Sequence, residues 1–207
     1  MKKNLLALAA AALVTSAAPV MTAQAAPAVA NLPATDRAAL NAASAYLQNL
    51  TSARGRFVQT DPNGQVSQGT FYLQRPGKIR FEYDAPSRML VVADGSNINV
   101  HDPRLKTFRR YPQGSTPLSL FLGRTINLET RAVTSVTRSA GGVAISARDP
   151  KNPRSGYITI GFSGSPLQLS EWTVVDPQNR KTRVRITSMT QTSNPASLFT
   201  LRNPNAG

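Results

Sequence analysis

The stretch that decides the fold reads Gly69-Thr70-Phe71-Tyr72-Leu73-Gln74-Arg75-Pro76-Gly77-Lys78-Ile79-Arg80-Phe81-Glu82-Tyr83. After the central Pro76-Gly77 turn, apolar residues occupy every second position and charged residues lie between them. This period of two is typical of a strand with one buried face and one wet face. The stretch therefore predicts an antiparallel hairpin with one apolar face.

The same period of two continues along the chain after Leu50. We expect strands near residues 53–61, 67–75, 77–84, 88–93, 97–101 and 105–111, and a second group near 131–138, 142–148, 156–162, 167–176 and 181–192. Turn sequences rich in Asp, Pro, Gly and Asn separate these strands, and no helix alternates with them. The pattern indicates a mainly-β protein whose strands follow one another in an antiparallel meander.

Two helices accompany the expected strands. The first follows a proline-containing lead, with Thr35 as its expected N-cap and apolar residues at helical spacing through Leu50. The second begins at Thr116-Pro117, a capping residue followed by proline at the first helical position, and it ends at Gly123. Its apolar side chains are Leu118, Leu120, Phe121 and Leu122. They suit either a plug between two halves of the sheet or a lid over an apolar concavity.

The first 25 residues predict a secretory signal peptide. Lys2 and Lys3 precede an apolar run, and Ala23-Gln24-Ala25 fits the small-residue rule for cleavage. The apolar run is too short for a transmembrane anchor, which would have to cross roughly 30 Å of hydrocarbon. We therefore expect a signal peptide over residues 1–25 and a single domain over residues 26–207, exported to the periplasm in soluble form.

The composition excludes several kinds of chemistry. The chain has 207 residues with no Cys and one His, so it cannot form a disulfide scaffold, a thiolate metal site or a multi-histidine metal site. It contains no phosphate-binding loop and no nucleophile-elbow motif. A lipid hydrolase would need His101 as its base, with Asp102 beside it. The residues predict no catalytic group, no metal, no cofactor and no enzyme activity.

Basic residues outnumber acidic residues by 24 to 10, which gives a net charge of +14. Arg54 and Arg56 share one face of a strand, as do Lys181, Arg183 and Arg185. Such rows either form a solvated face or attract anionic lipid or an acidic partner. Nucleic acid is not expected as a partner, because an exported protein does not meet it and aromatic residues make up only 6% of the chain.

Several short motifs occur in a fixed order in the first half of the mature chain. They are Gly55-Arg56-Phe57-Val58-Gln59-Thr60, the hairpin of residues 69–83, Pro86, Val91-Val92-Ala93-Asp94-Gly95, Asp102-Pro103 and Thr116-Pro117-Leu118. No single motif is specific, but the ordered set resembles the LolA family of periplasmic outer-membrane lipoprotein carriers. A weaker similarity extends over most of the mature chain.

The resemblance implies both a fold and a function. The implied fold is an unclosed, or half, antiparallel β-barrel of about eleven strands, with an N-terminal helix and a short helical lid. The implied function is the transfer of acylated lipoproteins from an inner-membrane ABC-type release complex to the outer membrane. An outer-membrane lipoprotein receptor would be a further partner in organisms that have one. The expected carrier is a monomer.

The resemblance also implies which residues act. The strand after the turn would face the acyl chains, and Arg75 would be the latch that hydrogen-bonds the lid closed. Together with the other apolar strand faces, the expected acyl-chain cavity comprises Phe57, Phe71, Leu73, Ile79, Phe81, Tyr83, Met89 and Val91. The expected lid residues are Leu118, Leu120 and Phe121. The alternative for the same strand faces is an ordinary packed core.

Departures from the family pattern bear on cargo and on function. The family usually has Trp where Phe81 stands, and an aromatic pair where Asn99 and His101 stand. We expect the loss of these rings to change the shape or polarity of the cavity. The lipid-anchored receptor of the same pathway needs an N-terminal cysteine, which this chain lacks. A periplasmic sensor of lipid or mislocalised lipoprotein on the same half-barrel is the alternative function, although such sensors usually carry a second domain.

We expect the signal peptide to be cut after Ala25, because Ala23 and Ala25 satisfy the small-residue rule. N-terminal sequencing of the exported protein checks this prediction. A mature form that retains the apolar run from Leu5 to Val14 would contradict the expectation of a soluble carrier.

Overall fold

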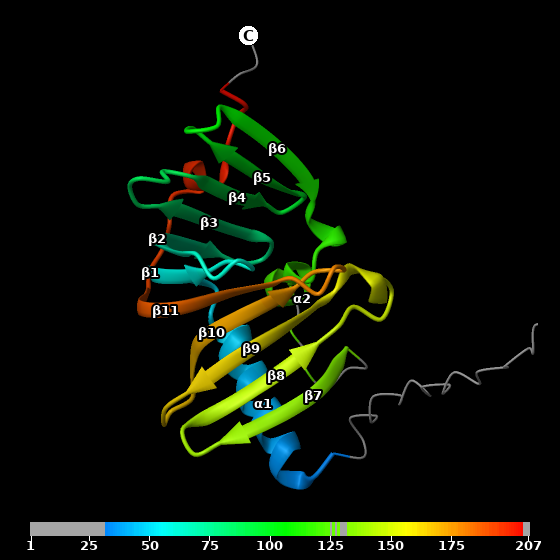
Figure 1. Cartoon of the computed structure of the whole chain (residues 1–207). Helices are drawn as coiled ribbons and strands as arrows, with labels where there is room; N and C mark the ends of the chain where they lie inside the picture. Colours follow the sequence, from blue (N-terminus) through cyan, green and yellow to red (C-terminus); the bar gives the residue numbers. More distant parts are fainter. Residues whose placement is uncertain (1–31, 125, 127, 129–131, 205–207) are drawn as a thin grey trace, which may run out of the picture.

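Eleven strands form one antiparallel sheet in the computed structural model, which describes residues 32–124, 126, 128 and 132–204 (Figure 1). The first six strands are β1 (Ser52–Thr60), β2 (Val66–Gln74), β3 (Lys78–Tyr83), β4 (Leu90–Asp94), β5 (Asn97–Asp102) and β6 (Thr107–Pro112). The other five are β7 (Val133–Ser139), β8 (Gly142–Ala147), β9 (Tyr157–Ser163), β10 (Gln168–Val175) and β11 (Lys181–Gln191). Each overlaps the strand expected at its place in the sequence. The expected signal peptide lies outside the described residues.

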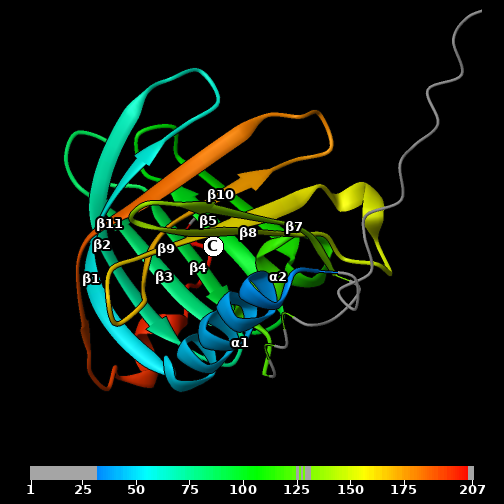
Figure 2. The same cartoon turned by 90° about the horizontal axis from the view of Figure 1, so that it is seen from below.

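The sheet curves into a barrel that does not close (Figures 1 and 2). Its strand order is β6-β5-β4-β3-β2-β1-β11-β10-β9-β8-β7, and within the described residues β6 and β7 do not pair with each other. The centre of the sheet is a seam between the first and last strands, where Ala53 lies opposite Gln191 and Thr60 lies opposite Arg183. A bulge interrupts this seam at Arg56/Phe57, and bulges of this kind increase the local twist. The expected unclosed antiparallel half-barrel is confirmed.

The two faces of the central hairpin differ as its sequence predicts. On the concave face Phe71 lies opposite Phe81 and Leu73 lies opposite Ile79, and all of these side chains are buried. The charged residues between them point to the convex face. This division places an apolar surface on the inside of the curve, where the helices cover it.

Helix α1 (Ala34–Asn49) runs along the concave side of the sheet and buries Leu40, Ala43 and Leu47 (Figure 2). The expectation that Thr35 caps this helix is wrong. The helix follows Pro33 directly, with no side-chain cap, and its first turn closes through hydrogen bonds from the backbone to the Pro33 carbonyl oxygen. Thr35 is therefore already inside the first turn.

Helix α2 (Leu118–Leu122) lies between β6 and β7 in the chain and ends at Gly123, as expected. Its start differs from the prediction by one residue. Pro117 occupies the N-cap position instead of the first helical position. The Thr116 hydroxyl donates to the carbonyl oxygen of Gln113 at 2.9 Å, so it caps the preceding 3₁₀ turn η2 (Gln113–Ser115) and not α2.

The C-terminal segment covers part of the convex face, a feature that the strand pattern did not predict. The 3₁₀ turn η4 (Ala196–Phe199) packs against β3 and β4, and Arg80 donates to the carbonyl oxygen of Leu198 at 3.1 Å. Phe199 and Val92 are buried outside the concave core. A further 3₁₀ turn, η3 (Pro153–Ser155), precedes β9 and was also not predicted.

Gly69 allows β2 to approach β3 closely. A Cβ at this position would lie 2.0 Å from the carbonyl oxygen of Glu82 and 2.9 Å from the ring of Phe57. We expect Gly69→Ala to lower the free energy of unfolding by about 1–3 kcal/mol, because the strand and the ring must move apart. The control is Gly141→Ala, whose Cβ would meet no atom within 4 Å. Urea denaturation measures both variants, and equal losses would contradict the close-approach argument.

Candidate functional site

A row of aromatic rings lines the concave interior. Phe57 contacts Phe81 and Tyr83 edge to face, with 5.1 Å between ring centroids in each pair. Trp172 of β10 lies 6.1 Å from Phe81 and stacks on Phe121 of α2 at 5.7 Å. The row therefore runs from β1 and β3 across the concave interior to β10, and on to the short helix.

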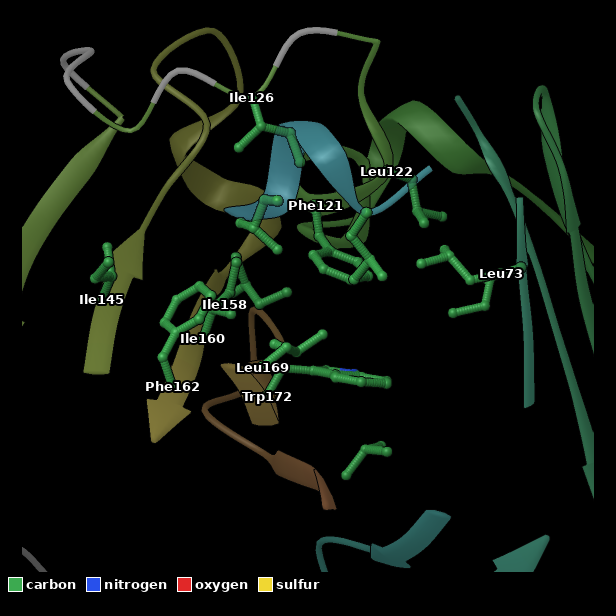
Figure 3. Close-up of a cluster of buried hydrophobic side chains, with 14 of the residues drawn as sticks. Leu73, Phe121, Leu122, Ile126, Ile145, Ile158, Ile160, Phe162, Leu169 and Trp172 are labelled. Carbon is green, nitrogen blue, oxygen red and sulfur yellow. The ribbon is translucent and has the colours of Figure 1, made fainter. Parts of the chain in front are cut away.

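The short helix points its largest side chains into this interior (Figure 3). Phe121 and Leu122 face Trp172 and Leu73, and both helix residues are at most 1% exposed. The second half of the sheet completes the cluster with Ile145, Ile158, Ile160, Phe162 and Leu169. The space inside the half-barrel is thus occupied by side chains of the protein itself.

The residues expected to line an acyl-chain cavity all lie on or beside this concave core. The buried ones are Phe57, Phe71, Leu73, Ile79, Phe81 and Tyr83. Met89 and Val91 are partly buried against the same cluster, as are the expected lid residues Leu118 and Leu120. The packed-core interpretation and the cavity interpretation therefore describe the same residues, against which Phe121 packs.

Trp172 belongs to this site and was missed by the sequence reasoning, and Leu122, which was assigned to the apolar short helix, was left out of the expected lid residues. Trp172 is the only tryptophan of the chain, and this alone could have marked it as a candidate site residue. The bulge between Leu169 and Glu171 interrupts the period of two in β10, so simple alternation does not place Trp172 on the apolar face. The indole lies 6.1 Å from the ring of Phe81.

The expectation that Asn99 and His101 alter the cavity is wrong. They lie opposite Val92 and Leu90, so they share the convex face of the sheet. The Asn99 amide donates to Asp94 at 3.0 Å and accepts a hydrogen bond from Arg110 at 2.9 Å. Sequence alone could not assign the face, because the alternation along β5 separates its two faces without showing which of them is concave.

Arg75 joins the end of β2 to both helices. Its Nη1 donates to the carbonyl oxygens of Leu47 and Leu50, the second at 3.5 Å, and its Nη2 donates to that of Gly123 at 2.8 Å. Carbonyl groups at the C-terminal end of a helix have no partners inside the helix. One guanidinium therefore satisfies the ends of α1 and α2 together.

The guanidinium of Arg75 is held by carbonyl groups alone. Burial lowers the pKa of Arg75 from its ordinary value, although an arginine side chain remains charged. Its Nε is buried without a hydrogen-bond partner, and no carboxylate of the described residues forms an ion pair with it. Breaking this contact requires no separation of opposite charges.

Further hydrogen bonds fix the segment around α2. The Gly77 N–H donates to the carbonyl oxygen of Leu122 at 2.7 Å, next to Arg75. On the other side, the Gln48 side chain accepts from the N–H of Ile126 at 3.2 Å, and the Ser44 hydroxyl accepts from the N–H of Leu128 at 3.2 Å. The short helix is thus tied to the β2–β3 turn and to α1.

The described residues offer no grouping of three His, Cys, Asp or Glu side chains that could hold a metal ion. Within the same residues, no helix has the length and apolar character needed to cross a membrane. His101 lies on the convex face, away from the apolar interior, so it cannot act as the base of a hydrolase there. What the site offers is an apolar interior under a hydrogen-bonded cover.

Comparison with known proteins identifies the same kind of molecule. Residues 48–202 match the family model described as outer membrane lipoprotein carrier protein LolA. The outer-membrane lipoprotein carrier protein of Dechloromonas aromatica is 35% identical over 73% of this chain and 76% of its own length. That of Methylobacillus flagellatus is 34% identical over 61% and 67% of the two chains.

A solved structure, the LolA superfamily protein of Nitrosomonas europaea, overlaps 80% of this chain and 97% of its own with a TM-score of 0.45 and 9% identity. Members of the matched family are periplasmic, non-enzymatic carriers of outer-membrane lipoproteins. The match covers the sheet from β1 to β11, and it shows that this chain belongs to the LolA family of outer-membrane lipoprotein carriers.

Proposed function

We propose that this chain carries lipoproteins by burying their acyl chains between the concave face of the sheet and α2. The observation that supports this most is the pairing of an apolar interior with a cover held by a polar contact. Phe121 and Leu122 fill the interior, while Arg75 holds the ends of the helices from the rim. An ordinary core would need no such separate attachment.

The magnitudes suit reversible binding. Moving Phe121 and Leu122 into water costs about 1.5–3 kcal/mol for each side chain. Breaking each hydrogen bond of Arg75 costs up to about 1.5–3 kcal/mol. An acyl chain gains about 0.8 kcal/mol for each buried CH₂, so a chain of about ten methylenes gains about 8 kcal/mol. These costs sum to about 7–15 kcal/mol, so one chain of this length only just offsets them, whereas two such chains open the cover with a reduced net affinity.

The closed state competes with cargo and favours release. In the proposed cycle, an inner-membrane ABC-type release complex supplies the acylated lipoprotein, and an outer-membrane lipoprotein receptor accepts it. The protein acts as a monomer. When the acyl chains leave, Phe121 returns to its place on Trp172 and the Arg75 contacts form again, which makes recapture less favourable.

Replacing Phe81 with Glu should abolish lipoprotein binding. Phe81 lies between Phe57 and Trp172, and an ionised carboxylate among these rings loses its solvation. Co-elution with a synthetic triacylated lipopeptide in gel filtration measures binding, and circular dichroism checks the fold. Tyr72→Glu places the same charge on the convex face and should bind normally. A folded Phe81→Glu protein that co-elutes with the lipopeptide would remove Phe81 from the site.

Replacing Arg75 with Leu should leave binding intact and slow release by about tenfold or more, because the closed state loses hydrogen bonds worth over about 1.4 kcal/mol in total. Arg75→Lys should be intermediate, since an ammonium cannot bridge both helix ends as the guanidinium does. Transfer of lipopeptide from the carrier to outer-membrane vesicles measures release. Arg54→Leu, at an exposed convex position, is the control. Release at the normal rate from Arg75→Leu would refute the latch.

A further inference from the structure

The half-barrel has two rims that are closed in different ways. At the first, which we call the latch rim, Arg75 and Gly77 bind the ends of the helices. At the opposite ends of the same strands lies the second, the turn rim, formed by residues 61–65, 84–87 and 102–104. Alternate hairpins of an antiparallel meander turn at the same side, which is why these three turns meet. The hydrogen bonds that tie α2 to the sheet lie at the latch rim.

A hollow of about 490 Å³ opens at the turn rim. Gln59, Ser67 and Met89 form the part of its wall that continues onto the concave face of β1, β2 and the start of β4. Gln68 and Ser87 also line the hollow. The hollow therefore adjoins the apolar interior at the ends of these strands.

One hydrogen bond between described side chains lies where the wall of the hollow meets the rings of the interior. The Tyr83 hydroxyl donates to the Gln59 side-chain oxygen at 2.7 Å. The Tyr83 ring is 8% exposed and packs on Phe57, the first ring of the interior row. Burial raises the pKa of Tyr83 above its ordinary value, so the hydroxyl remains a donor at any physiological pH. The contact between Tyr83 and Gln59 is neutral, whereas the latch rim is held by the charged guanidinium of Arg75.

The wall of the hollow suits a group that is rich in acceptor oxygens. Its carboxylates are already occupied. Asp61 accepts from the backbone N–H groups of Asn63 and Gln65, and Asp84 is paired with Arg56. The remaining polar groups of the wall are amide and hydroxyl donors and the guanidinium of Arg104, and all of them can donate to the carbonyl oxygens of esters and amides.

We propose that the turn rim is the mouth of the carrier, and that its hollow binds the ester and amide groups of the acylated N-terminal cysteine of a lipoprotein. The acyl chains then pass Tyr83, run along Phe57 and Phe81, and reach Trp172 and the cover last. This inference rests on the proposed acyl-chain function. It adds an order of events, in which the chains enter at one rim and open the latch at the other.

Single cysteines test the direction of entry, because the chain contains none of its own. Ser87→Cys at the turn rim and Ser96→Cys in the β4–β5 turn at the opposite rim each carry a bimane fluorophore. The probe is a triacylated lipopeptide with a nitroxide quencher on the residue after the acylated cysteine. We expect quenching at position 87 to exceed that at position 96 by about fivefold or more, because the nitroxide quenches only a fluorophore that it can touch, and β4 separates the two positions by roughly 17 Å at about 3.4 Å per residue.

Stronger quenching at position 96 would contradict the proposal that the turn rim is the mouth of the carrier, and it would leave the acyl-chain function in place. A lipopeptide that does not co-elute with the unmodified protein would overturn both proposals. Because these outcomes differ, the experiment distinguishes a wrong place of entry from a wrong carrier function.

The contact between Tyr83 and Gln59 is tested separately by Tyr83→Phe, which removes the hydrogen bond and keeps the ring. Loss of one neutral hydrogen bond should raise the association rate of the lipopeptide by about fivefold. Tyr72→Phe, on the convex face, is the matched control and should bind at the normal rate. Stopped-flow fluorescence measures both variants, and an unchanged rate in Tyr83→Phe would overturn the role of this contact.

Discussion

The concave face of the sheet has to be covered by something apolar, and the rest of the structure follows from this constraint. A sheet that curves without closing brings many apolar side chains to the inside and leaves the opening unfilled. In the structure α1 and α2 supply the cover, with Phe121 stacked on Trp172 at its centre. In the proposed function a lipid chain, which is as apolar as this cover, takes its place, so that binding and folding use one surface.

The polar part of the design keeps this exchange reversible. Arg75 holds the helices through backbone carbonyl groups at their ends, which are solvated as soon as the helices move away. A carboxylate partner would have created a buried ion pair, and breaking such a pair leaves two charges to be resolvated. The carbonyl arrangement gives a defined closed position without that barrier.

Much of the fold and part of the site could be predicted because the sequence is locally consistent. The strand positions followed from a period of two and from turn residues. The ordered motifs around residues 69–83 identified the family. The failures have physical causes. The bulge beside Leu169 broke the periodicity that would have placed Trp172 inside. The covering of Val92 by Phe199 depends on a contact between distant segments, which no local pattern reports. Asn99 and His101 were placed wrongly because alternation fixes relative faces but not which face is concave.

The seam between β1 and β11 has a consequence for the newly made chain. The strand nearest the N-terminus gains its second neighbour only when the strand nearest the C-terminus is available. Contacts between distant segments form late, because closing a long loop must precede them. A chain that emerges N-terminus first can build the β1–β6 hairpins early, but Trp172 and the other half of the interior are missing. The lipid-binding space thus comes into existence in one final step, and an incompletely delivered polypeptide has no place to hold an acyl chain.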